Sequence, residues 1–197
     1  MKRIILNDRD YKIIEFIKEF KVATTSTIAN MFFPSLRTAQ RRLKYLAEHG
    51  YIKAYQEHIT LEKIYYINKR PSQLKHALIL SSFISELKKA NIDILKYKVH
   101  FKLGNVIADC LLVLNYNNKN YIYLVEVENT KAFNLTKYED LYYSRAYKEK
   151  LPTFPDIIAI SNRTVKKSNK FDVIDIKLDF SNIDKFFSNL NVTKCIV

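Results

Sequence analysis

Residues 34–50, PSLRTAQRRLKYLAEHG, carry signals for both ends of one helix. Ser35 follows Pro34 and is a favoured N-cap residue, and Gly50 stands where a left-handed C′ residue closes a helix. The apolar residues between them recur at the three-and-four spacing of one buried stripe. They are Leu36, Ala39, Leu43, Leu46 and Ala47. The sequence therefore predicts an amphipathic helix with defined ends.

The opposite stripe of this helix carries long polar side chains, almost all of them cationic. Side chains of these types bridge phosphates and reach base edges in the major groove of DNA. We therefore predict DNA contacts at Arg37, Thr38, Gln40, Arg41 and Lys44. The alternative is a solvated polar face on an ordinary amphipathic helix.

The neighbouring segments favour the DNA-contact hypothesis. Two helices are predicted ahead of residue 34, at about residues 8–20 and 25–32, each behind a polar N-cap candidate. After Gly50, the runs YIKAYQ and KIYYIN flank EHITLE and predict a hairpin. Three helices followed by a hairpin form a winged helix. Its hairpin would place Lys53, His58 and Lys63 beside the sugar-phosphate backbone.

The charge of the chain fits an anionic partner. The sequence has 33 Lys and Arg against 20 Asp and Glu, a formal net charge of +13. Nucleic acid is the commonest partner of so basic a protein, and the winged helix specifies double-stranded DNA. The sequence contains no secretory signal and no membrane-spanning run, so we expect a cytoplasmic protein without membrane contact. Cys110 and Cys195 lie in no zinc-binding pattern, and there is no Gly-rich phosphate loop.

A second domain is predicted after a linker at residues 69–71. We assign residues 1–70 to the winged helix and residues 71–197 to an α/β domain with a mixed sheet, which makes the chain α+β. The second domain is expected to begin with a broadly apolar helix over residues 72–90. It continues with strands at 92–101, 106–114 and 121–128, a helix from a Thr136–Glu139 capping box to about 148, strands at 156–161 and 172–180, and a helix ending near 190.

Three acids lie on two of these predicted strands. If Asn117 and Asn118 form the turn, Asp109 lies directly across from Glu126, and Glu128 shares their face. Facing acids within apolar strands repel each other and resist burial. A divalent cation compensates such a pair, and oxygen ligands suit Mg²⁺ or Mn²⁺. The alternative is that this face is solvated and holds no metal.

With these acids in place, the order helix, three strands, helix, strand resembles the PD-(D/E)xK restriction-endonuclease-like core. A winged helix joined to such a core resembles the replication-relaxation family of plasmid and phage proteins. The resemblance implies catalytic acids at Asp109, Glu126 and Glu128. It also implies metal ligands at Asp109 and Glu126, with Glu86 on the preceding helix as a third acid.

The sequence departs from that motif at Glu128, where the motif has Lys. Lys131 or Lys137 is a candidate for a displaced amine, and without a placed cation the attacking water and departing phosphate lose electrostatic support. We therefore predict a DNA-binding protein of a plasmid or phage that acts in replication or its control, with a degenerate nuclease-like domain. The alternatives are an active Mg²⁺- or Mn²⁺-dependent endonuclease and a noncatalytic module that recruits replication proteins. The sequence leaves open whether the protein is a homodimer.

Overall fold

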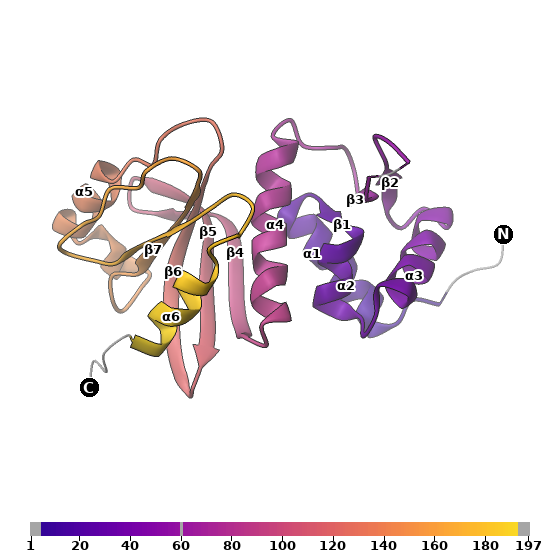
Figure 1. Ribbon diagram of the computed structural model, residues 1–197, viewed down its shortest axis with the longest axis horizontal. Helices are drawn as coiled ribbons and strands as arrows, with labels where there is room; N and C mark the ends of the chain where they lie inside the picture. The colour runs from indigo at the N-terminus through magenta and orange to yellow at the C-terminus, as the bar shows by residue number, and fades with distance from the viewer. Residues whose placement is uncertain (1–4, 60, 193–197) are drawn as a thin grey trace. The chain divides into compact units, whose positions relative to one another are not determined.

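The computed structural model describes residues 5–59 and 61–192 and has an α+β fold (Figure 1). Within those residues it contains six α-helices, a three-stranded sheet and a mixed five-stranded sheet. The chain divides into two compact units, one ending at Asn91 and the other beginning at Ile92. Each unit contains one of the two sheets.

Three helices open the first unit and begin where the sequence predicts. They are α1 (Asp8–Phe20), α2 (Thr25–Phe32) and α3 (Leu36–Glu48). Asn7 and Asp10 form a capping box at the start of α1. The side chains of Thr24 and Ser35 accept backbone N–H groups at the starts of α2 and α3. These bonds satisfy N–H groups that have no partner inside the helix. Gly50 has a φ of +77°, a left-handed conformation that glycine adopts without strain.

The predicted hairpin is present and forms a small antiparallel sheet with a third strand. The sheet has the order β1-β3-β2. Its strands are β1 (Ala23–Thr24), β2 (Lys53–Tyr55) and β3 (Ile64–Tyr66). Tyr65 lies at the centre, pairs with Ala54 and Ala23, and is buried. Strand β1 was not predicted from the sequence, because two residues are too few to show a strand periodicity.

The fourth helix, α4 (Leu74–Lys89), belongs to the first unit. It contacts α1, α2 and β1, and the hydroxyl oxygens of Thr27 on α2 and Ser82 on α4 lie 3.3 Å apart. The first compact unit therefore extends to Asn91, past residue 70, where the sequence predicts a domain boundary. The physical reason is that this broadly apolar helix packs on the three-helix core rather than opening the next unit.

The second unit is built on a five-stranded sheet of order β4-β5-β6-β7-β8. Its elements are β4 (Asp93–Leu103), β5 (Val106–Tyr116), β6 (Lys119–Glu128), α5 (Thr136–Ser144), the 3₁₀ helix η1 (Ala146–Glu149), β7 (Asp156–Ser161), β8 (Val173–Ile176) and α6 (Asp184–Val192). The first three strands pair antiparallel, and the last two join in parallel. Cys110 pairs with Val125, which is the register predicted from a turn at Asn117 and Asn118.

Helices α5 and α6 cover opposite faces of this sheet. Tyr123 and Leu124 are neighbours on β6, so their side chains point to opposite faces. Tyr138 of α5 lies in one hydrophobic cluster with Leu124. Phe186 of α6 lies on the other side, with its ring centroid 5.4 Å from that of Tyr123. The side chains that share the Leu124 face of β6 therefore point toward α5.

Three predicted details of the second unit are wrong. Thr136 is the first residue of α5 rather than its N-cap, and no side chain caps the helix, so the predicted capping box is absent. The helix ends at Ser144, where Arg145 adopts a left-handed φ of 57°. Strand β8 ends at Ile176, although the alternation of the sequence continues to Phe180. Phe180 has a φ of 59°, which is not a strand conformation.

Candidate functional site

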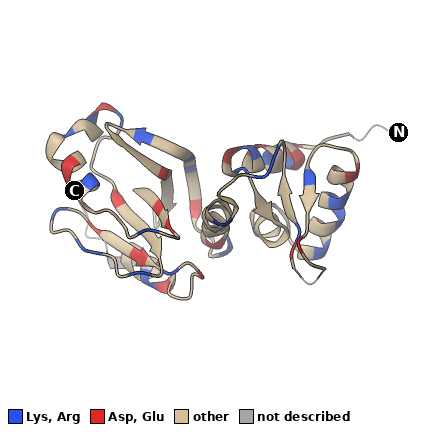
Figure 2. Cartoon of the chain, turned by 90° about the horizontal axis from the view of Figure 1, so that it is seen from above, with Lys and Arg blue, Asp and Glu red and all other residues tan. Residues whose placement is uncertain are grey.

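The polar stripe of α3 is its exposed face. The residues that the sequence places opposite the apolar stripe are all exposed: Arg37, Gln40, Arg41 and Lys44. On the other side, Ala39, Leu43 and Leu46 are completely buried. Leu36, in the first turn, is exposed although the stripe pattern predicts burial. Lys and Arg segments, coloured blue, are prominent on the helices of the first unit (Figure 2).

Thr38 differs from the other predicted contacts on α3. It is half-buried, and its hydroxyl oxygen lies 2.9 Å from the Ser35 hydroxyl oxygen. Its backbone N–H also donates to the Ser35 hydroxyl, at 3.4 Å. Thr38 therefore takes part in the capping interaction with Ser35 and is only partly available at the outer surface of the helix.

Arg42 is a cation of α3 to which the sequence analysis assigned no role. Its Nε donates to Asp10 Oδ1 at 2.8 Å, and a terminal nitrogen donates to Asp10 Oδ2. The Asp10 side chain is fully buried. Burial alone would raise the pKa of Asp10, but hydrogen bonds from Arg42 and from the Asn7 backbone outweigh it and lower the pKa. Arg42 thus fixes α3 to α1, while its neighbour Arg41 is exposed.

The hairpin exposes both lysines that were predicted to contact DNA. Lys53 Nζ donates to a backbone carbonyl oxygen at 3.0 Å. The Lys63 carbonyl oxygen accepts the Thr25 N–H at 3.1 Å, which ties the hairpin to the start of α2 and leaves the Lys63 side chain exposed. Glu62 accepts the N–H of Ser26 at 3.0 Å and its hydroxyl at 2.8 Å. The N-terminus of α2 is therefore already covered by a carboxylate.

The second unit brings Asp109 and Glu126 together on neighbouring strands. Asp109 Oδ2 accepts the Val127 N–H at 2.8 Å. Glu126 is only 4% exposed, and its Oε1 accepts a bond of 2.7 Å from Lys137 Nζ on α5. The Tyr138 hydroxyl donates to the same oxygen. One oxygen of a buried carboxylate therefore accepts hydrogen bonds from both a lysine and a tyrosine.

The electrostatics of Glu126 follow from this arrangement. Burial and the nearby charge of Asp109 raise the pKa of Glu126 to about 7, while Lys137 and Tyr138 act in the opposite direction. Burial and the charge of Glu126 also raise the pKa of the Tyr138 phenol. Glu126 therefore changes its protonation near neutral pH.

The remaining predicted residues of this site lie in different surroundings. Glu128 is half-buried further along β6, and its charge contributes to the raised pKa of Tyr138. Glu86 lies on α4 of the first unit, where its Oε2 is 3.6 Å from Lys89 Nζ. Lys131 is exposed, so the amine that contacts Glu126 is that of Lys137. Both lysines were candidates for the displaced amine, because no spacing rule in the sequence chooses between them.

The fit of a divalent metal can be tested on these groups. Among residues 5–59 and 61–192, no group of three or more His, Cys, Asp and Glu side chains has an arrangement that would hold a metal ion. The Lys137 ammonium lies beside Glu126 and already supplies the positive charge that a metal ion would bring. An incoming cation would compete with this bond, so metal binding at Asp109 and Glu126 stays a prediction.

Comparison of the chain with protein-family models, with curated proteins and with solved structures gives no match. Within the part of the chain that the structure describes, no helix is both long enough and apolar enough to cross a membrane.

Proposed function

We propose that the first unit is a winged-helix module that binds double-stranded DNA through α3. The observation that supports this most strongly is the exposed row of Arg37, Gln40, Arg41 and Lys44 on a helix whose other face is buried. Such side chains bond to phosphates and to base edges when a helix lies in the major groove. Arg42 bonds to Asp10 and holds α3 in place, whereas Arg37 and Arg41 are exposed on the helix surface.

The hairpin supplies the second contact in this proposal. Lys53 and Lys63 are exposed on it, and cations at a wing neutralise backbone phosphates without distinguishing sequence. The net charge of +13 adds a long-range attraction to DNA that depends on salt. We further propose, from the resemblance to the replication-relaxation family, that the DNA is that of a plasmid or phage and the process its replication or control.

The second unit is a nuclease-like domain in this proposal. One observation favours a second candidate function, metal-dependent DNA cleavage. Lys137 places an amine 2.7 Å from Glu126, although position 128 carries no lysine. Asp109 and Glu126 would hold Mg²⁺ or Mn²⁺, which would supply Lewis-acid activation of the phosphate. Lys137 would then supply the placed cation. In the noncatalytic alternative, Lys137 serves only to neutralise a buried carboxylate.

The leading proposal is tested by titrating the full chain into labelled duplexes tiled across the replicon that encodes it. Binding should be saturable, should weaken steeply with added salt, and should be strongest for one or a few duplexes. Parallel incubations with Mg²⁺ or Mn²⁺ report any cleavage. Absence of binding at low salt to every duplex would contradict the proposed function.

A further inference from the structure

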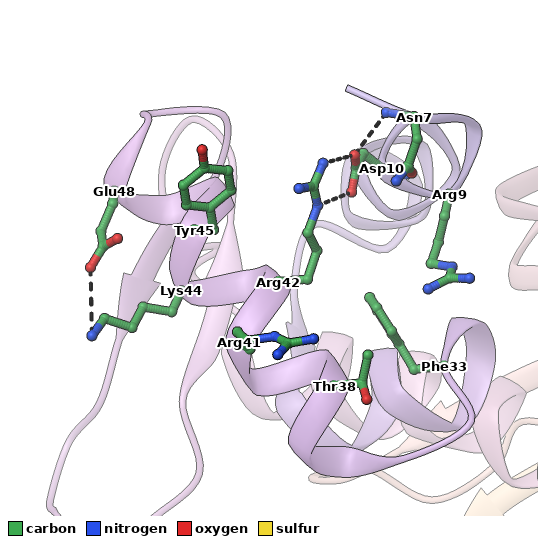
Figure 3. Close-up of a pocket in the computed structure, with 10 residues that line it drawn as sticks. All are labelled: Asn7, Arg9, Asp10, Phe33, Thr38, Arg41, Arg42, Lys44, Tyr45 and Glu48. Carbon is green, nitrogen blue, oxygen red and sulfur yellow. Dashed lines mark hydrogen bonds and ion pairs between the residues drawn. The ribbon is translucent and has the colours of Figure 1, made fainter. Parts of the chain in front are cut away.

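A cavity of about 530 Å³ lies in the first unit between the start of α1 and the exposed side of α3 (Figure 3). Arg9 and Asp10 line it from α1, and Phe33 lines it from the end of α2. Arg41 and Lys44 line it from α3. Two of its walls thus come from α3, the helix proposed to contact DNA, and from α1, for which no DNA contact was predicted.

The charges around this cavity are not balanced. Arg42 is bonded to Asp10, and Lys44 Nζ lies 3.7 Å from Glu48 Oε1. Arg9 and Arg41 make no ion pair within residues 5–59 and 61–192. The cavity therefore has two guanidinium groups from separate helices that form no ion pair among the described residues, although the charge of Arg9 helps to lower the pKa of Asp10.

Arg9 is positioned by an aromatic ring. Its guanidinium carbon lies 4.9 Å from the centroid of the Phe33 ring, within the range of a cation–π contact. Such a contact uses no N–H···O hydrogen bond, so the guanidinium N–H groups of Arg9 can donate to a ligand. Figure 3 shows Arg9 and Arg41 on separate helices, with Phe33 and Thr38 near them. Paired guanidinium donors of this kind suit the oxygens of a phosphate group.

We propose that this cavity binds a backbone phosphate of the DNA strand that borders the groove contacted by α3, clamped between Arg9 and Arg41. The inference rests on the proposed function and extends it to α1. Arg41, Lys44 and Thr38 belong both to the cavity and to the predicted DNA contacts, so a strand lying on α3 passes the cavity mouth. The start of α2 is not an alternative anion site, because the Glu62 carboxylate already bonds there.

The test uses the full chain and a labelled duplex at several salt concentrations. Arg9→Ala should weaken binding several-fold and reduce the salt slope by about one, equally for specific and nonspecific duplexes. Arg9→Lys keeps the charge and should retain most of the slope. Lys18→Ala is the matched control, because it removes one exposed cation from the same helix outside the cavity. Glu48→Gln should tighten binding, since it removes the acid beside Lys44.

Two comparisons separate failure of this inference from failure of the proposed function. Arg37→Ala combined with Gln40→Ala changes α3 outside the cavity. If that variant loses affinity while Arg9→Ala behaves like Lys18→Ala, the clamp is overturned and DNA binding by α3 stands. If no duplex binds at all, the proposed function itself fails.

The cavity could instead bind a free phosphate ion, which carries the same oxygens as a DNA phosphate. If inorganic phosphate at constant ionic strength stabilises the wild type, and Arg9→Ala abolishes this effect without changing DNA affinity, the cavity is a free-anion site and the DNA assignment is overturned.

Discussion

Lys137 Nζ lies 2.7 Å from Glu126 Oε1, and this bond joins α5 to the centre of the five-stranded sheet. The carboxylate is almost fully buried, and the ammonium is its counter-charge. Even so, burial and Asp109 keep the pKa of Glu126 raised, at about 7. A buried acid with this pKa makes the stability of the unit depend on pH near neutrality.

The first prediction follows from the sign of that shift. The pKa of Glu126 rises from its ordinary 4.5 to about 7 on folding, so the folded state binds the extra proton between these values. The free energy of unfolding should therefore fall as pH rises through this window, by about 3 kcal/mol from this group. Glu126→Gln removes the titration, so the stability of the variant relative to wild type should rise between pH 4.5 and 7. Urea unfolding of both proteins at pH 5 and pH 8 measures this change in relative stability. A stability difference between variant and wild type that is the same at both pH values would contradict the prediction.

A second prediction concerns the ion pair between Arg42 and Asp10. Removing Arg42 leaves the fully buried Asp10 carboxylate without its cation, so Arg42→Met should destabilise the first unit by about 3 kcal/mol. Asp10→Asn together with Arg42→Met should cost less than the sum of the single changes, because the charges are removed together. Arg41→Met is the matched control, since Arg41 is exposed. The stability of the Arg41→Met variant should change by less than about 0.5 kcal/mol. Equal losses of stability in Arg42→Met and Arg41→Met would argue against a structural role for Arg42.

The third prediction concerns the limits of the first unit. A fragment of residues 1–91 should fold cooperatively, because it retains α4 and its contacts with α1, α2 and β1. A fragment of residues 1–70 lacks α4 and should expose apolar surface on α2. Circular dichroism during thermal unfolding distinguishes them. A sharp transition in the shorter fragment would show that the boundary predicted from the sequence was correct.

Sequence reasoning was most successful where the determinants are local. The starts of the first three helices, and the strand register set by the Asn117–Asn118 turn, depend on residues only a few positions apart. These features could be predicted because side-chain capping and turn geometry act over that range.

The misses came from contacts between distant residues. The structural role of Arg42 could not be predicted from the sequence, because its buried partner, Asp10, lies on another helix. The same limit left Lys131 and Lys137 as equal candidates, since only the docking of α5 on the sheet brings Lys137 to Glu126. It also left open which elements α4 packs against, because amphipathicity shows that a face is buried and not what covers it.

A fourth prediction separates the nuclease candidate from the noncatalytic alternative. If Asp109 and Glu126 bind a divalent metal, Mn²⁺ should raise the melting temperature, because a ligand of the folded state alone stabilises it. Asp109→Asn should abolish the rise. Lys137→Met should strengthen metal binding, because it removes the ammonium that competes for Glu126, but should abolish any DNA cleavage. Lys131→Met should affect neither. If Mn²⁺ leaves the melting temperature unchanged and no duplex is cut, the metal site and the nuclease candidate are both wrong.

The central claim is that the exposed face of α3 binds DNA, and salt-dependent affinity is its most direct test. Replacing Arg37, Arg41 and Lys44 by Ala should weaken binding to duplex DNA and lower the slope of log affinity against log salt by about two to three, because fewer counterions are released. The control replaces Lys166, Lys170 and Lys177 by Ala, which removes the same charge from exposed positions in the second unit. The account predicts a large loss in the first variant and a small one in the control. Equal affinities and slopes in both variants would contradict it.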